Sequence, residues 1–174
     1  QGVQIGNMNE VNTSAESYVL WQWVANGTGT VDSDGMIKQS DSSTSSITVS
    51  ANTTAGFSII EYTGNGSTST IAHGLGAIPA FMVVNNITVD GTYKPQVYHQ
   101  GIGDTGTLTL TETSSVSTAS TYWNNGDPAF STTTFTVGNS NATNKDTEVF
   151  KAYVWAEVEG YSKFGSYAGN NDDN

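Results

Sequence analysis

The chain of 174 residues contains no cysteine and no arginine, and its five basic residues are all lysine. Without cysteine it can form no disulfide, thiolate zinc site, iron–sulfur cluster or cysteine nucleophile. Sixteen Asp and Glu residues against five Lys give a net charge of −11, which argues against binding to nucleic acid or to an anionic membrane surface. Apolar runs as long as Ala152–Ala156 reach only five residues, so we expect no transmembrane helix.

Small polar residues dominate what is present. Ser (20), Thr (25), Asn (16) and Gly (19) together make up 80 of the 174 residues. Thr favours pleated strands, while Gly, Asn and Ser favour turns. The 18 aromatic residues (4 Trp, 8 Tyr and 6 Phe) are too many for a disordered chain. Such hydroxyl- and amide-rich surfaces are frequent on extracellular and virion proteins.

Short apolar runs recur between turn signals, and no window of a dozen residues has convincing helical periodicity. This pattern predicts an all-β fold, an antiparallel β-sandwich of the jelly-roll or lectin-like kind. The predicted strands are Tyr18–Val24, Ser45–Ser50, Phe57–Thr63, Ala80–Val89, Tyr93–His99, Thr107–Thr113, Thr133–Gly138, Glu148–Val158 and Tyr161–Tyr167.

Three local patterns refine these strands. In Thr107–Thr113 the alternation predicts that Leu108 and Leu110 point inward. In the late strand, Phe150, Ala152, Val154 and Ala156 share one face, while Tyr153 and Trp155 share the other, so we expect cover on both faces. Asp90-Gly91 between two strands predicts a two-residue hairpin turn.

The chain divides into four predicted parts. Residues 1–24 form an N-terminal strand segment, and residues 25–54 a Ser/Thr-rich connection that is extended or mobile over 25–46 and holds one short strand, Ile47–Val49. Residues 55–160 form the sandwich module, and residues 161–174 a C-terminal strand with an acidic tail.

The two ends echo strands inside the module. Glu16–Trp23 is similar to Glu148–Trp155, and Gly160–Asn170 is similar to Gly56–Asn65 with one inserted residue. The alternatives are chance similarity among short aromatic strands, or one unit of a tandem array. In an array, each terminal strand either folds back onto its own module or inserts into the next copy. We favour exchange between copies.

Several strings together resemble a module of tailed-phage virion proteins, found in tail-fibre-like proteins of marine and other environmental phages. The resemblance covers roughly residues 15–170. It implies a structural or adhesive virion component and no catalytic residue. The strings are Gly56–Gly66, Ile71-Ala-His-Gly-Leu-Gly-Ala-Ile-Pro79, Val97-Tyr-His99, Ser120-Thr-Tyr-Trp-Asn-Asn125 and Val158-Glu-Gly-Tyr-Ser-Lys-Phe-Gly-Ser-Tyr167.

Catalytic and metal chemistry find little support in the sequence. His73 lies beside Gly74 and Gly76 ahead of Pro79, and we expect a structural turn in which His73 does no chemistry. No Gly-x-Ser-x-Gly elbow or phosphate-binding loop occurs. We therefore predict no enzyme, no cofactor and no metal site. Asp32-Ser33-Asp34-Gly35 resembles half a calcium loop but lacks the distal Glu, and calcium at a subunit junction stays open.

Two sets of residues are candidates for binding. A loop combining an aromatic ring with amide and carboxylate groups suits sugar recognition, although a core Trp is the simpler interpretation. That loop contains Tyr122, Trp123, Asn124, Asn125 and Asp127. The aromatic residues of the terminal strands are candidates for assembly, namely Tyr18, Trp21, Trp23, Tyr161, Phe164 and Tyr167.

These observations favour a non-enzymatic phage virion protein, namely a tail-fibre, decoration or filament module, placed on the virion or outside the cell. Its expected partners are further copies of itself and other virion proteins, by burial of edge strands and apolar faces. The alternative is a carbohydrate-binding adhesion module for host surface glycans. A surface-polysaccharide depolymerase is a remote third hypothesis.

Overall fold

The computed structural model describes residues 13–20, 38–39, 47–88, 92–123 and 129–169. In these residues it contains strands and one short helix. They are β1 (Lys38–Gln39), β2 (Ile47–Asn52), β3 (Phe57–Thr63), β4 (Ser69–Ala72), β5 (Phe81–Asn86), β6 (Gln96–His99), β7 (Gly106–Thr109), β8 (Ser117–Thr118), β9 (Thr134–Val137), α2 (Asn141–Asn144) and β10 (Val149–Trp155).

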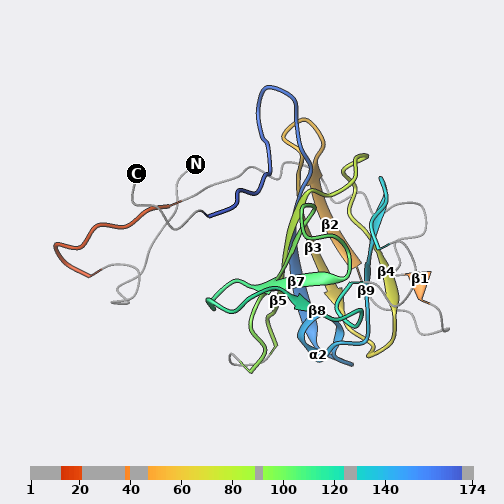
Figure 1. Ribbon diagram of the computed structural model, residues 1–174. Helices are drawn as coiled ribbons and strands as arrows, with labels where there is room; N and C mark the ends of the chain where they lie inside the picture. Colours follow the sequence, from red (N-terminus) through yellow and green to blue (C-terminus); the bar gives the residue numbers. More distant parts are fainter. Residues whose placement is uncertain (1–12, 21–37, 40–46, 89–91, 124–128, 170–174) are drawn as a thin grey trace.

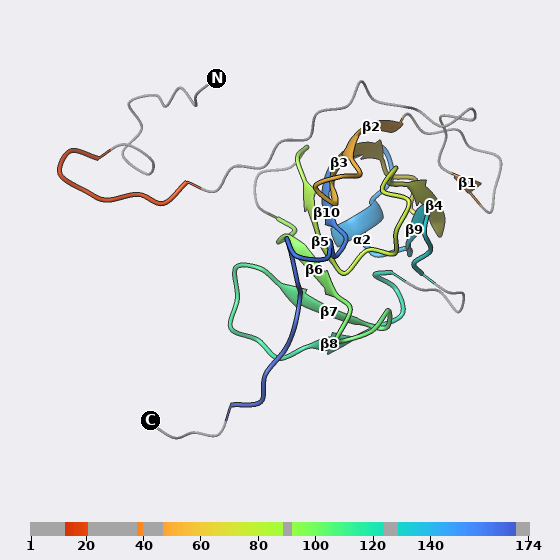
Figure 2. The ribbon, with the colours of Figure 1, turned by 90° about the horizontal axis from the view of Figure 1, so that it is seen from above.

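The strands form two sheets that face each other (Figure 1). The larger sheet has the order β2-β3-β10-β5-β6-β7-β8, and the smaller has the order β1-β4-β9. Every paired strand is antiparallel to its neighbour. Viewed from above, the large sheet curves around α2, with β4 and β9 opposite β3 (Figure 2). The predicted all-β antiparallel sandwich is confirmed, and the large sheet is not closed on itself.

Strand β10 is the centre of the core. Its buried positions alternate with half-buried ones, and Phe150, Ala152 and Val154 point inward as predicted. Beside Phe150 in the same sheet lies Tyr62 of β3, whose ring stacks on Phe150 at 5.3 Å and meets Phe135 of β9, in the smaller sheet, edge-on at 6.4 Å. Burial of each such side chain stabilises the fold by roughly 1.5–3 kcal/mol, so the two sheets are held together chiefly here.

The opposite face of the large sheet is only half covered. We call it the outer face and define it by Ile59 of β3, Phe81 and Val83 of β5, and Tyr153 and Trp155 of β10, which share one side by register. All five side chains are half-buried. The expected cover on both faces of β10 is therefore complete on the inner face and partial on the outer face.

Helix α2 closes one end of the sandwich. Ser140 caps it, its side chain accepting a hydrogen bond from the Ala142 N–H. The Tyr62 hydroxyl donates to the Thr143 carbonyl, and the Asn144 side chain donates to the Gly138 carbonyl at 2.9 Å. This helix was not predicted, because four residues without apolar periodicity carry no helical signal in a sequence.

Three predicted strands are wrong in extent. β7 ends at Thr109, and Leu110 is 57% exposed rather than pointing inward, because its N–H bonds to the Pro95 carbonyl while the Glu112 N–H closes a turn onto Thr109. Tyr161–Tyr167 is not a strand, and its one bridge joins Ser162 to Val158. In Tyr18–Val24, the described residues 18–20 are not a strand either.

Other boundaries also differ from the prediction. β2 lies inside the predicted connection 25–54 and pairs with β3 along six residues, so the sandwich begins before residue 55. β5 and β6 do pair as an antiparallel hairpin. Because β5 ends at Asn86 and β6 begins at Gln96, their connection is longer than two residues. Asp90 and Gly91 lie outside the described residues, as do 25–37 and 40–46 of the connection.

Candidate functional site

In the predicted sugar-binding loop, the ring of Trp123 does not face solvent. Trp123 is fully buried in the core, and its Nε1–H donates to the Gly106 carbonyl at 3.0 Å. The simpler interpretation, a core Trp, is confirmed, and the buried Trp123 ring does not face a sugar. Tyr122 is half-buried, with its ring 6.5 Å from that of Trp123. Asn124, Asn125 and Asp127 lie outside the described residues.

His73 is a structural residue of the turn after β4. Its side chain is fully buried, Nδ1 accepts a hydrogen bond from the Leu75 N–H at 3.2 Å, and Nε2 lies 3.2 Å from the Ser131 carbonyl. Nδ1 must therefore be unprotonated, and Nε2–H donates to Ser131. Burial lowers the pKa of His73, which keeps the ring neutral. Gly74 and Gly76 have φ of +70° and +71°, as expected for the turn.

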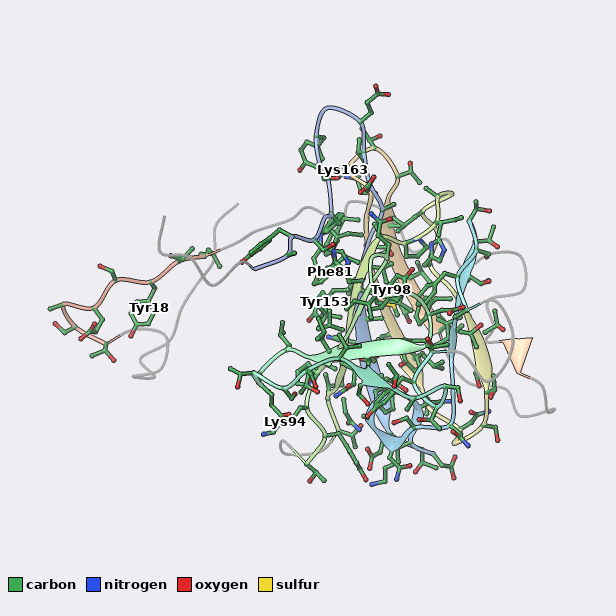
Figure 3. All side chains as sticks on the ribbon, in the orientation of Figure 1. Tyr18, Phe81, Lys94, Tyr98, Tyr153 and Lys163 are labelled. Atoms are coloured by element: carbon green, nitrogen blue, oxygen red, sulfur yellow. The ribbon has the colours of Figure 1, made fainter. Side chains whose placement is uncertain are left out.

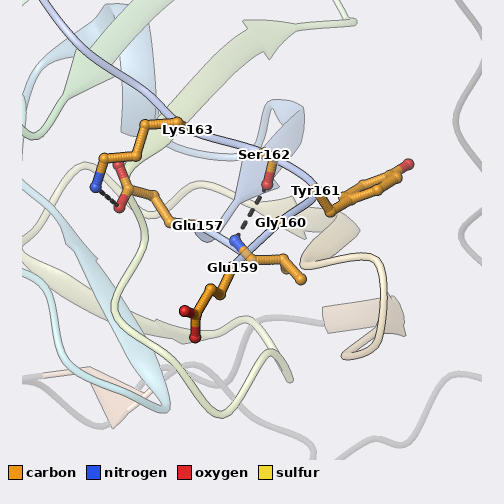
Figure 4. Close-up of a pocket in the computed structure, with 7 residues that line it drawn as sticks. Glu157, Glu159, Gly160, Tyr161, Ser162 and Lys163 are labelled. Carbon is orange, nitrogen blue, oxygen red and sulfur yellow. Dashed lines mark hydrogen bonds and ion pairs between the residues drawn. The ribbon is translucent and has the colours of Figure 1, made fainter.

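A surface hollow of about 600 Å³ is lined by seven consecutive residues, 157–163 (Figure 4). Two of its charged groups are paired, since Lys163 Nζ lies 2.6 Å from Glu157 Oε2, while Glu159 is exposed. This contact lowers the pKa of Glu157 and keeps the carboxylate charged. Tyr161 points away from the ion pair in Figure 4 and is exposed. The hollow is thus the inside of one turn, closed by the bonds between Val158 and Ser162.

The same turn fixes the C-terminal segment to the large sheet. The Gln100 side chain, just after β6, donates to Glu157 Oε1 at 2.8 Å and to the Phe164 carbonyl at 3.0 Å. The Phe164 N–H donates to Glu157 Oε1 at 3.1 Å. The Phe164 ring then stacks on Phe81 of the outer face, with centroids 5.6 Å apart and planes 6° from parallel. The segment is anchored as far as Phe164, and residues 165–169 beyond it are exposed.

The predicted assembly residues divide into anchored and exposed ones. Phe164 is half-buried on the outer face, whereas Tyr161 is exposed and Tyr167 is 95% exposed. Tyr18 is exposed as well, on a segment that extends away from the sandwich (Figures 1 and 3). Trp21 and Trp23 lie outside the described residues. Of the described members of this set, Phe164 packs on the sandwich, while Tyr161 and Tyr167 are exposed.

Comparison with known proteins gives a single positive result. The model of one protein family, described as "Domain of unknown function (DUF7483)", matches residues 1–174, which is the whole chain. The chain belongs to this family. No curated protein and no solved structure matches it. Since the family description names no function, the function of this DUF7483 chain has to be argued from its own geometry.

The other charged cluster of this DUF7483 chain is structural. Glu148 is buried, accepts a hydrogen bond from the Asn86 side chain, and pairs with Lys145 at 2.5 Å. The Lys145 contact lowers the pKa of Glu148, and Lys145 Nζ also lies 5.4 Å from the centre of the Tyr93 ring. Lys145 and Asn86 thus pair with the only carboxylate found buried among the described residues, and its charge is neutralised by Lys145.

Metal and membrane sites find no support in the described part of the chain. Within it, no three His, Asp or Glu side chains gather as metal ligands would, while the Asp32–Gly35 string falls in a part that the structure does not describe. No helix there is long and apolar enough to span a membrane.

The sequence analysis placed Tyr153 and Trp155 on a second face of the late strand but missed Phe81, Val83 and the residues that anchor Phe164 to this face. Phe81 and Val83 alternate with the core residues Met82 and Val84, so the period-2 pattern of that predicted strand would have placed them on a second apolar face. Gln100 and Glu157 give no such signal, because their contact depends on how the chain folds back after β10.

Proposed function

We propose that this chain is a non-enzymatic structural module of a phage virion that acts by self-association and by displaying an acidic, hydroxyl-rich surface. The observation that carries the proposal is the exposure of apolar side chains on the segments at both ends of the sandwich. Val19 is 84% exposed, Leu20 65% and Tyr167 95%. Contiguous exposed apolar surface marks sites of protein association, and the neighbouring Val19 and Leu20 contribute such surface.

The charge distribution supports display rather than binding of anions. Of the five lysines, Lys145, Lys151 and Lys163 each lie against a glutamate, namely Glu148, Glu61 and Glu157. With a net charge of −11, much of the acidic excess faces solvent. Such a surface repels nucleic acid and anionic lipid and keeps the particle soluble.

The virion location and the expected virion partners depend on the resemblance of the His73–Pro79 and Val158–Tyr167 strings to phage tail-fibre-like modules. The His73 turn is built around Gly74 and Gly76, which suits a structural role for that string. Glycan binding, the alternative, has less support than before, because Trp123 belongs to the core and only Tyr122 is left half-exposed in the described part of that loop.

The proposal is tested by the association state of the purified chain. We expect oligomers or filaments that grow with protein concentration, measured by sedimentation velocity and negative-stain electron microscopy. Deleting residues 1–24 should weaken association. A chain that stays monomeric at every concentration up to the millimolar range would contradict the proposal.

A matched pair of substitutions separates the terminal segment from general surface stickiness. Leu20→Ser changes a leucine on the projecting segment that is 65% exposed, and Leu110→Ser changes one on the sandwich that is 57% exposed. We expect Leu20→Ser to weaken association and Leu110→Ser to leave it unchanged. Equal effects of both changes would show that the ends have no special part in association.

A further inference from the structure

The two terminal segments each repeat one particular strand. Glu16–Trp23 is similar to Glu148–Trp155, which contains β10, and Gly160–Asn170 is similar to Gly56–Asn65, which contains β3. In the second match, Tyr167-Ala168-Gly169-Asn170 aligns with Tyr62-Thr63-Gly64-Asn65, and the inserted residue falls between Phe164 and Tyr167.

The two repeated strands are direct partners in the structure. β10 and β3 pair antiparallel over seven residues, from Val149 opposite Thr63 to Trp155 opposite Phe57. In the middle of this register Phe150 lies opposite Tyr62, and their rings stack at 5.3 Å with planes 13° from parallel. The two ends therefore repeat the sequences of two strands whose side chains pack against each other in this fold.

Within one copy these end segments have no strand position to occupy. The β3 and β10 positions of the sandwich are filled by residues 57–63 and 149–155 themselves. Residues 18–20 and 163–169 adopt no strand conformation. Val19, Leu20 and Tyr167 are strongly exposed, which is unfavourable for apolar side chains unless a partner covers them.

We propose that the N-terminal segment of one copy pairs antiparallel with the C-terminal segment of a second copy, in the register of β10 and β3. This inference rests on the proposed self-association and specifies its contact. Aligning Tyr18 with Phe150 and Tyr167 with Tyr62 places Tyr18 opposite Tyr167 at the junction. Leu20 falls on the same face as Tyr18, since alternate residues of a strand share a face. Because each copy offers one segment of each kind, the contact is head-to-tail, and it builds an open filament where it does not close into a ring.

The outer face offers an apolar surface on which the paired terminal segments can pack. A two-stranded ribbon alone is only marginally stable in water, so it needs an apolar surface beneath it. Phe164 already stacks on Phe81 there, and Val83 and Tyr153 beside it are half-buried. The register of β5 and β10 puts Tyr153 on the same face as Phe81, and Figure 3 shows the two close together on the sandwich. Because Phe164 already holds the C-terminal segment on this face, the paired segments would pack beside it.

The absence of cysteine makes disulfide trapping a direct test. Tyr18→Cys protein is mixed with Tyr167→Cys protein under mild oxidation, and cross-linked dimer is measured on a non-reducing gel. Residues directly opposite in an antiparallel pair have Cα atoms about 4.5–5.5 Å apart, within disulfide reach. We expect a mixed dimer that forms in preference to like-with-like dimers of either protein alone.

The register has its own control. Val19→Cys mixed with Tyr167→Cys moves the thiol by one residue and hence to the other face of the strand. We expect loss of the mixed dimer with this pair. Equal cross-linking by both pairs would overturn the proposed register.

The remaining outcomes separate the inference from the proposed function. If the unaltered chain assembles by sedimentation velocity but Tyr18→Cys and Tyr167→Cys do not cross-link, the inference is wrong and self-association stands. If the double variant Tyr18→Cys/Tyr167→Cys cross-links only within single chains, the ends pair inside one copy and the second copy is excluded. If the unaltered chain never associates, the proposed function itself fails.

Discussion

At the residue scale, the turn between β4 and β5 depends on two backbone conformations and one side chain. Gly74 and Gly76 adopt a positive φ that side chains with a β-carbon rarely tolerate. His73 ties this turn to Ser131 ahead of β9 through its Nε2. The His73 side chain therefore extends the contact between β4 and β9 beyond their last paired residues, within the smaller sheet.

Replacing Gly76 isolates the backbone cost of this turn. A β-carbon at Gly76 would meet nothing within 4 Å, so the effect of Gly76→Val comes from its φ of +71° and not from a clash. We expect a loss of about 1–3 kcal/mol in the free energy of unfolding, measured by urea denaturation.

Two controls accompany this change. Gly165→Val is also made in open space but without a positive φ, and it should change stability by less than about 0.5 kcal/mol. Gly76→Asn should recover much of the loss, because Asn tolerates the left-handed region. Equal losses for Gly76→Val and Gly165→Val would mean that the turn carries no conformational cost.

His73 should make stability depend on pH. Burial lowers its pKa in the folded chain, so below about pH 6.5 the unfolded chain binds a proton that the folded chain resists. The stabilisation is full above that pH and is lost as the pH falls through it, by at most about 1.4 kcal/mol per pH unit for one proton. Protonated Nδ1 would also oppose the Leu75 N–H.

Urea midpoints at pH 7.5 and pH 5.5 measure this effect. The unaltered chain should be less stable at pH 5.5, and His73→Gln should reduce the difference. The contacts with Lys145 and Lys163 lower the pKa of Glu148 and of Glu157, so their loss of stabilisation falls at more acidic pH than this window. A pH dependence identical in His73→Gln would rule out His73 as its source.

At the scale of elements, α2 acts through the buried side chain of its last residue. Asn144 Nδ2 donates to the carbonyls of Ser67 and Gly138, and its Oδ1 accepts from the Asn65 N–H at 3.0 Å. The Asn144 amide thus connects α2 both to the loop between β3 and β4 and to the residue that follows β9. A helix of four residues contributes little by itself, and this amide is what holds it against the sheets.

Asn144→Asp keeps the shape and removes the hydrogen bonds that Nδ2 donates to the carbonyls of Ser67 and Gly138 and to Asn65 Oδ1. Because these acceptors then lose their donor, we expect a loss of about 2–4 kcal/mol in the free energy of unfolding, measured by denaturation with guanidinium. Asn141→Asp makes the same chemical change at the exposed start of α2 and should have almost no effect. Comparable losses in both variants would contradict a special role for Asn144.

The individual strands show which parts of the fold could be predicted from the sequence. β3, β9 and β10 have strong apolar alternation or runs, and each was predicted within a few residues of its bounds. β4, Ser-Thr-Ile-Ala, was missed because Ile71 is its one large apolar residue. The Tyr161–Tyr167 strand failed for the opposite reason: its aromatic pattern is strand-like, but Glu157 and Gln100 fold it across the sheet end. Contacts between distant residues decided these cases, and local pattern does not contain them.

The candidate sites follow the same division. The structural role of His73 could be expected from its glycines, since turn chemistry is local. Whether Trp123 faced a sugar or the core depended on the Gly106 carbonyl, which lies in β7 and is distant in sequence. The echo between the ends and two internal strands was visible in the sequence, but only the sheet order shows that those two strands are partners.

At the scale of the whole molecule, net charge should control association. Each copy carries −11, so copies repel one another at low ionic strength, where screening extends over about 30 Å at 0.01 M salt and only about 8 Å at 0.15 M. We expect association to strengthen as NaCl is raised from about 10 mM to about 150 mM, measured by sedimentation velocity. Weakening over this range would indicate that ion pairs between copies, rather than apolar contacts, hold the assembly.

The position of β10 has a consequence for synthesis on the ribosome. β10 follows the other described strands in the chain and yet lies between β3 and β5 in the sheet. Translation of the residues between Asn86 and Val149 takes roughly 3–12 s at about 5–20 residues per second. During that time both edges that will receive β10 stay unpaired, and such edges attract other strands. A ribosome that stalls in this interval would release a chain with its sheet split in two, so the nascent chain is most aggregation-prone before β10 has emerged.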